Sequence, residues 1–172
     1  MRLVTISGIV VLFGLMGCDT HENNGHTNLV NEAMVMKYFE AAIKPDFESM
    51  EEFLSEDYKQ LGPAIKDSVD RATHVANWRK SWEEEFSSIT YDRFGILSTT
   101  VAEGRVAGDW VLDWGKLTIN YKNGKPSFTV WFHAALRLKN GKINRQRNFY
   151  DSGDVMSQQG FTFVPASEEG KK

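Results

Sequence analysis

The chain has 172 residues, 20 of them basic and 23 acidic, with a formal net charge of −3 at neutral pH. Such a weakly acidic chain, without a long basic run, does not fit a nucleic-acid-binding protein, because those proteins neutralise phosphates with clustered Lys and Arg. Its single cysteine excludes a disulfide within the chain, so stability must come from a hydrophobic core, which a chain of this length can bury.

The first 17 residues predict an export signal. Arg2 precedes an uncharged apolar stretch, residues 3–16, that is too short to span a bilayer as a helix. It ends in Leu15-Met16-Gly17-Cys18, which resembles the lipobox of bacterial lipoproteins. The resemblance implies cleavage before Cys18, lipid on its thiol, and a protein anchored to a membrane of the bacterial cell envelope. The alternative is a buried cysteine behind a plain signal peptide.

The domain boundaries follow from composition. Residues 18–28, almost all polar, predict a tether that carries the lipidated Cys18. A single domain is expected over residues 29–165, and residues 166–172 are expected to form a flexible tail.

Helical spacing dominates the first half of the domain. It predicts a helix after an N-cap at Asn28, a short helix capped by Asp46, and a third helix over about residues 70–86, with a short extended piece at residues 57–61 between the last two. The apolar positions that recur at this spacing are Leu29, Ala33, Met36, Phe39 and Ile43, then Phe47, Met50, Phe53 and Leu54, then Val75, Trp78, Trp82 and Phe86.

After residue 88 the period changes to two, which is typical of strands. Strands are predicted over residues 89–101, 105–121, 127–139 and 142–151, and turns at Glu103-Gly104, Asn123-Gly124 and Asn140-Gly141. Strands in succession without a helix between them form an antiparallel meander, and the preceding helices must cover one of its faces. The sequence therefore predicts an α+β fold with three N-terminal helices on a curved antiparallel sheet of four to six strands.

The last strand carries a resemblance to a known family. Residues 141–161, GKINRQRNFYDSGDVMSQQGF, resemble the end of SnoaL-like domains in the nuclear-transport-factor-2-like superfamily, and the stretches FLSEDY and GDWVLDWG are similar as well. The resemblance covers about residues 28–161 and implies a cone-shaped α+β barrel with a pocket between the concave sheet face and the helices. Polyketide cyclases, ketosteroid isomerases, epoxide hydrolases and non-catalytic binding modules share this fold, so the resemblance alone does not give the activity.

The implied pocket suggests a set of ligand-binding residues. Polar side chains would come from the helix layer and the last strand, and aromatic walls from the third helix and the sheet. For the tryptophans the alternative is a place in the core or in a dimer interface. The candidates are Tyr38, Tyr58, Trp78, Trp114, Phe132, Asn148 and Tyr150. We expect a small, mostly apolar or amphipathic ligand, no cofactor, and no metal, because outside the tether no His lies at ligand spacing from Cys, Asp or Glu.

Catalysis would need an acid or base in this pocket. Two positions where enzymes of the family carry an acid are Ala134 and Asn148 here, which favours binding without catalysis. The remaining candidates are Asp113, if no bulge at Trp114-Gly115 turns it outward, and Asp151, which could instead cap a helix. With either one the protein would be a cofactor-independent isomerase, cyclase or hydrolase, whose buried carboxyl group has a raised pKa.

The opposite face of the sheet suggests an interface. Strand alternation places Trp131 and His133 on the face that does not carry Phe132. An aromatic patch on an uncovered sheet face predicts association, most simply as a homodimer or otherwise with a partner protein.

Overall fold

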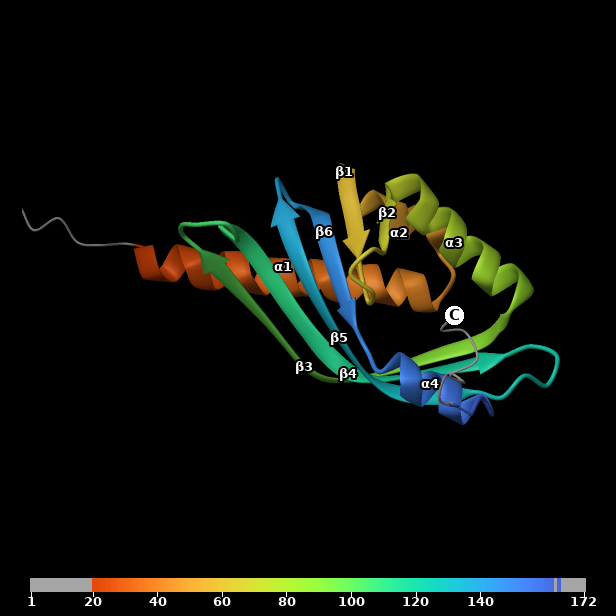
Figure 1. Cartoon of the computed structure of the whole chain (residues 1–172). Coiled ribbons are helices and arrows are strands. Elements are labelled where there is room, and N and C mark those ends of the chain that lie inside the picture. The colour runs from red at the N-terminus through yellow and green to blue at the C-terminus, as the bar shows by residue number, and fades with distance from the viewer. Residues whose placement is uncertain (1–19, 163, 165–172) are drawn as a thin grey trace, which may run out of the picture.

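The computed structural model describes residues 20–162 and 164. Helices and strands occur in an order that confirms the predicted α+β class (Figure 1). The elements are α1 (Thr20–Ile43), α2 (Phe47–Glu52), β1 (Leu54–Leu61), β2 (Ser68–Asp70), α3 (Arg71–Glu84), β3 (Phe86–Val101), β4 (Gly108–Tyr121), β5 (Phe128–Lys139), β6 (Lys142–Phe149) and α4 (Ser152–Gln158). Figure 1 shows a strongly curved sheet with α1 running across it and α3 beside the same face.

One sheet contains all six strands of the described part of the chain, in the order β2-β1-β6-β5-β4-β3. Strands β3 to β6 form the predicted antiparallel meander. Strand β1, however, pairs in parallel with β6, for example Gln60 with Gln146. The sheet is therefore mixed and open at both edges. This parallel pairing is a departure from the predicted antiparallel sheet, because it joins segments far apart in the chain that no local signal connects.

Two of the predicted turns explain the regularity of the meander. In Asn123-Gly124 and Asn140-Gly141 all four residues have positive φ angles, between 53° and 72°. Glycine adopts this conformation freely and asparagine tolerates it better than most residues, so these pairs suit tight hairpin turns. Both connections place the flanking strands within a residue or two of the predicted boundaries.

The helices differ from the predictions in three respects. Helix α1 begins at Thr20 and not at Asn28, so that residues predicted as a tether are helical. Its buried side includes Val35 and Tyr38, whereas Leu29 is 68% exposed. Of the predicted stripe, Phe39 and Ile43 do pack on the core, so the inward face of α1 agrees with the spacing only in its second half. A fourth helix, α4, follows β6, capped by Asp151 as the alternative interpretation of that residue had it.

The core lies between the concave sheet face and the helices. Its larger cluster joins α1 and α2 to the middle of the sheet, and a second cluster lies at the end of β3, β4 and β5, where Val155 of α4 also packs. Trp78 and Trp82 of α3 contact both clusters. The indole Nε1 of Trp82 donates to the backbone oxygen of Ala42 at 3.0 Å, which ties α3 to α1. The helix layer is thereby held at a fixed position over the sheet.

A bulge interrupts the pairing of β3 with β4 near Asp113, but its extra residue belongs to β3 and not to β4. Arg93 pairs with Gly115 and Gly95 pairs with Trp114, so that Phe94 is the extra residue and is 75% exposed. Strand β4 keeps its register against β5 from residue 109 to residue 119. Asp113 therefore points inward, which is the orientation expected of it in the absence of a bulge at Trp114-Gly115.

Candidate functional site

A cavity of about 380 Å³ lies between α3, the segment that joins β1 to β2, and the concave face of the sheet. Its walls are mostly apolar, with aromatic rings from α3, β3 and β5. Principal wall residues are Trp78, Phe86, Leu117, Phe128, Val130 and Phe132. A smaller extension of about 60 Å³ continues beneath α1 and shares Trp78, Leu117, Phe132 and Asn148 with it. This is the pocket expected between the sheet and the helices.

Polar side chains meet at one wall of this cavity. The Tyr38 hydroxyl is 2.9 Å from Nε2 of His74 and donates to Oε1 of Gln146 at 2.8 Å. The Tyr58 hydroxyl donates to the same oxygen at 3.0 Å. Nε2 of Gln146 donates in turn to Oδ1 of Asn148 at 2.8 Å. Helix α1, strand β1, helix α3 and strand β6 each contribute to this network, which fixes the polar atoms relative to the apolar walls.

Burial keeps this network uncharged. The pKa of His74 falls from 6.5 to about 4 because the buried ring would have to lose its hydration to carry a charge. Burial raises the pKa of Tyr38 and the pKa of Tyr58 in the same way. At neutral pH the ring and both hydroxyls are therefore neutral hydrogen-bonding groups.

All but one of the predicted cavity residues lie in or directly behind the walls of the cavity and its extension. Trp78, Phe132, Asn148 and Tyr150 line the cavity, and Tyr38 lines its extension, while Tyr58 is fully buried behind the wall within the polar network. Trp114 does not line the cavity. Inward positions of β4 are 111, 113 and 115, so Trp114 faces the other side of the sheet, where its ring stacks on His133 at 6.2 Å.

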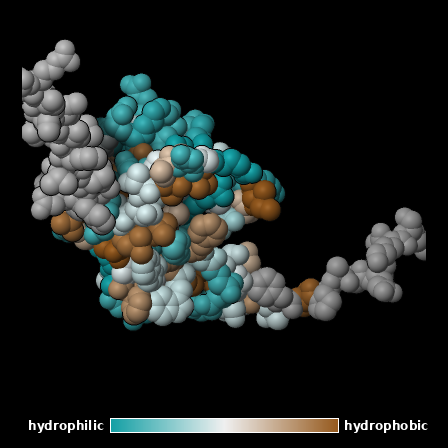
Figure 2. Space-filling view, turned by 90° about the vertical axis from the view of Figure 1, so that its left-hand side faces the viewer, coloured by the Kyte–Doolittle hydropathy of each residue, from teal (hydrophilic) through white to brown (hydrophobic). Residues whose placement is uncertain are grey.

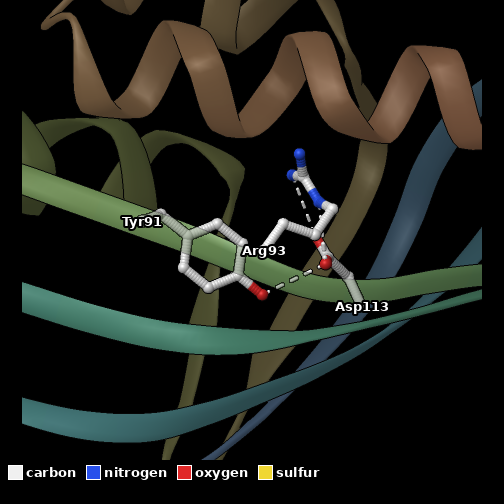
Figure 3. A network of polar contacts seen from close by, with 3 residues as sticks. All are labelled: Tyr91, Arg93 and Asp113. Atoms are coloured by element: carbon white, nitrogen blue, oxygen red, sulfur yellow. Dashed lines mark hydrogen bonds and ion pairs between the residues drawn. The ribbon is translucent and has the colours of Figure 1, made fainter.

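Asp113 forms an ion pair with Arg93 (Figure 3) and does not line the cavity. Arg93 donates to both carboxylate oxygens, at 3.0 and 3.1 Å, and the Tyr91 hydroxyl donates at 3.1 Å. The carboxylate is completely buried. Figure 3 shows the three side chains between the strands and the helix that crosses above them. A carboxylate held by three donors is suited to stabilising the fold and not to transferring protons.

The carboxylate of Asp151 also has a structural role, because it caps helix α4. One oxygen of its carboxylate accepts hydrogen bonds from the backbone nitrogens of Gly153 and Asp154, at 2.8 and 3.0 Å, which is the geometry of an N-cap. The side chain is exposed and does not line the cavity. Neither predicted acid therefore meets the space that a ligand would occupy.

The outer face of the sheet carries the predicted interface residues. Trp131 is 64% exposed, and its ring packs edge-on against Phe94 at 6.3 Å. His133 lies between Trp114 and Phe149, and these aromatic side chains line a shallow groove. Apolar surface is also exposed elsewhere: Figure 2, which views the end of the molecule at the left of Figure 1, shows apolar patches among hydrophilic ones. The structure thus places Trp131 and His133 together, on an uncovered face.

Sequence reasoning missed the role of His74. It stood alone in the sequence, without a carboxylate or cysteine at ligand spacing, and α3 brings it to Tyr38 across 36 residues. Gln146, two residues before the candidate Asn148 on the same strand, is the other member of the network outside the predicted set. The one signal in the sequence for His74 was its position next to Val75, a member of the apolar stripe predicted for the third helix. In the structure both residues lie on the inner side of α3, and His74 is 2% exposed.

Helices over a curved, open sheet with an interior cavity define an α+β protein of the nuclear-transport-factor-2-like type. The model of the SnoaL-like domain family matches residues 35–146, so the chain belongs to this family. A search of curated proteins returned no significant match. Among the described residues, no helix is long and apolar enough to cross a membrane. Cys18 lies outside the described residues.

Solved structures with the same fold come from several bacteria. An LEH-like epoxide hydrolase from Mycobacterium tuberculosis is 14% identical with a TM-score of 0.61, over 77% of this chain and 91% of the other. A SnoaL-like protein from Shewanella denitrificans, named as a polyketide cyclase, is 12% identical with a TM-score of 0.61, over 75% and 96%. An NTF2-like protein of unknown function from Burkholderia pseudomallei is 13% identical with a TM-score of 0.58, over 77% and 98%. These similarities establish the fold.

Proposed function

We propose that this SnoaL-like domain binds a small, mostly apolar molecule in the cavity between α3 and the sheet, without catalysing a reaction on it. The observation that supports this function is the cavity itself: apolar walls, one polar edge, and enough volume for a small organic molecule. Hydrogen-bonding groups fixed by a buried network orient a ligand without activating it. The two acids that could have served catalysis make other contacts.

The alternative is a cofactor-independent isomerase, cyclase or hydrolase, and similar folds include proteins named as epoxide hydrolase and polyketide cyclase. Such an enzyme would need a group that exchanges protons in the cavity. Arg93 and Tyr91 hold the Asp113 carboxylate away from it, and Asp151 caps α4. The binding function therefore has the stronger support.

Retained small molecules provide the test. The mature domain, purified under native conditions, is expected to release a small apolar molecule that mass spectrometry detects after denaturation. Leu117 lines both the cavity and its extension, so Leu117→Trp should fill that space and abolish retention. Leu97→Trp, at a position that is 40% exposed on β3, serves as the control and should retain the molecule. Equal retention by both variants would contradict binding in this cavity.

Two further features complete the proposal. The sequence Leu15 to Cys18 supports export and a lipid anchor on Cys18, which would hold the domain at a membrane of the cell envelope. The aromatic patch of the outer face, with Trp131 at its centre, supports a homodimer through that face. An anchored dimer would present its cavities at a fixed distance from the membrane.

A further inference from the structure

Two tyrosine hydroxyls share one amide oxygen in the polar network. Oε1 of Gln146 lies 2.8 Å from the hydroxyl of Tyr38 and 3.0 Å from that of Tyr58. Burial raises the pKa of both phenols, so both protons stay in place. An amide oxygen has two lone pairs and can accept both. The tyrosines therefore use the full accepting capacity of Gln146.

This sharing fits the orientation that the Gln146 amide has in the structure. Oε1 accepts from both buried tyrosine hydroxyls, and Nε2 donates to Oδ1 of Asn148, so each of these polar groups has a partner. The nitrogen of Gln146 points away from the tyrosines, toward Asn148.

His74 is consistent with the same direction of donation. The one proton of Tyr38 goes to Gln146, so the Tyr38 oxygen is left to accept from Nε2 of His74 at 2.9 Å. The ring is neutral, since burial lowers its pKa to about 4, and its single proton is therefore on Nε2. Donation runs in one direction, from His74 through Tyr38 and Gln146 to Asn148.

The end of this chain of hydrogen bonds faces the ligand space. Nε2 of Gln146 donates to Oδ1 of Asn148, which leaves Nδ2 as the group that Asn148 can offer elsewhere. Asn148 lines both the cavity and its extension, and within the described part of the chain Nδ2 has no acceptor. The interior of the protein thus presents an N–H donor at the polar edge of the cavity.

The charged residues of the cavity limit the kinds of ligand that it can bind. The described residues that line it include no Lys or Arg. Its one carboxylate, Asp67, accepts a hydrogen bond from the backbone nitrogen of Ala64 at 3.1 Å. An anionic ligand would lose its hydration there without gaining a counter-ion. The space favours a neutral molecule.

We propose that the cavity selects neutral, mostly apolar ligands whose polar end is a hydrogen-bond acceptor, a carbonyl oxygen, and that Nδ2 of Asn148 is the donor that selects them. This inference rests on the binding function proposed above. Asn148 acts as a specificity residue, and Gln146 positions it.

Three probes with the same carbon skeleton test this selection: 2-acetylnaphthalene, 1-(2-naphthyl)ethanol and 2-ethylnaphthalene. Their affinities for the mature domain are measured by isothermal titration calorimetry. One neutral hydrogen bond contributes about 0.5–1.5 kcal/mol, so the ketone should bind roughly 2- to 13-fold more tightly than the hydrocarbon. The ketone should also bind more tightly than the alcohol, which must turn its own proton away from Nδ2 to accept.

Variants separate the roles of the two amides. Asn148→Asp replaces the donor by an acceptor and should reverse the order of ketone and alcohol, and Asn148→Ala should abolish the ketone preference while the hydrocarbon still binds. Gln146→Glu still accepts from both tyrosines but cannot donate to Asn148, so the ketone preference should weaken. Asn120→Asp makes the same substitution at a residue that lines neither the cavity nor its extension, and it should leave the preference unchanged.

The outcomes distinguish this inference from the proposed function. Failure of all three probes to bind would overturn the binding function and this inference with it. Equal affinity of ketone and hydrocarbon for the unmodified domain would overturn the selection alone. A ketone preference that survives in Asn148→Ala would assign the donor to another group and would equally overturn it.

Discussion

Replacing Arg93 by methionine should test the structural role of Asp113. Methionine keeps an apolar stem of similar length and removes the guanidinium that donates twice to the buried carboxylate. Only the hydrogen bond from Tyr91 then remains. Asp113 has no exposed surface, so its charge would be left with one partner in a site that water reaches poorly.

The magnitude follows from the geometry of this pair. Removing one partner of a buried ion pair typically costs about 3–5 kcal/mol of the free energy of unfolding. The Arg93 side chain is 26% exposed, so some water can approach, and the Tyr91 hydroxyl persists. We therefore expect the lower end, about 3 kcal/mol, which for a domain of this size lowers Tm by about 6–12 °C.

Urea denaturation followed by tryptophan fluorescence measures this loss. The double variant Arg93→Met and Asp113→Leu should recover most of the stability, because an apolar pair can replace a buried ion pair at little cost. Arg79→Met removes the same side chain from an exposed ion pair with Glu48 and should change the urea midpoint far less. A loss below about 1 kcal/mol for Arg93→Met, or a double variant no more stable than the single one, would refute the reasoning.

Three further predictions concern His74, the outer face and the anchor. Burial lowers the pKa of His74 from 6.5 to about 4, so the unfolded chain takes up the proton first as pH falls. The contribution of neutral His74 to the free energy of unfolding is therefore fully present above pH 6.5, and about 3 kcal/mol of it is lost between pH 6.5 and 4. His74→Gln should remove this part of the pH dependence in urea titrations at a series of pH values, and an unchanged slope would contradict it. Trp131→Glu should convert a dimer into a monomer in sedimentation velocity, whereas an unmodified protein that is already monomeric at high micromolar concentration would contradict the interface. Cys18→Ser should yield an uncleaved or soluble form in cell fractions, and a variant that is still processed and membrane-bound would argue against lipidation.

Local signals in the sequence predicted the meander well. Asn-Gly pairs require positive φ angles that few other residues tolerate, and they set the hairpin turns at residues 123–124 and 140–141. Asp46 predicted the start of α2 for a similar reason, since its carboxylate accepts a hydrogen bond from the backbone nitrogen of Ser49 at 3.1 Å. Each signal acts within a few residues, so it can be read without knowledge of the fold.

Features set by distant segments were not predictable in the same way. Three of these features depend on where separate elements pack: the parallel pairing of β1 with β6, the burial of Val35 in place of Leu29, and the hydrogen bond between His74 and Tyr38. Trp114 could have been placed correctly by alternation, because the face that carries Asp113 cannot also carry its neighbour. Apolar aromatic character alone favoured the cavity, and it does not distinguish the two faces of a sheet.

The parallel pairing of β1 with β6 also bears on how the chain folds. Strands β3, β4 and β5 each pair with the next strand along the chain, whereas β1 needs residues 143–147, far along the chain, to complete its pairing. Contacts over such sequence separations raise the contact order and slow folding. Gln146 lies in the same strand, so its contacts with Tyr38 and Tyr58 depend on the same distant pairing. A chain cut short of that residue would lose both the strand that connects the two halves of the sheet and the amide that orients Asn148.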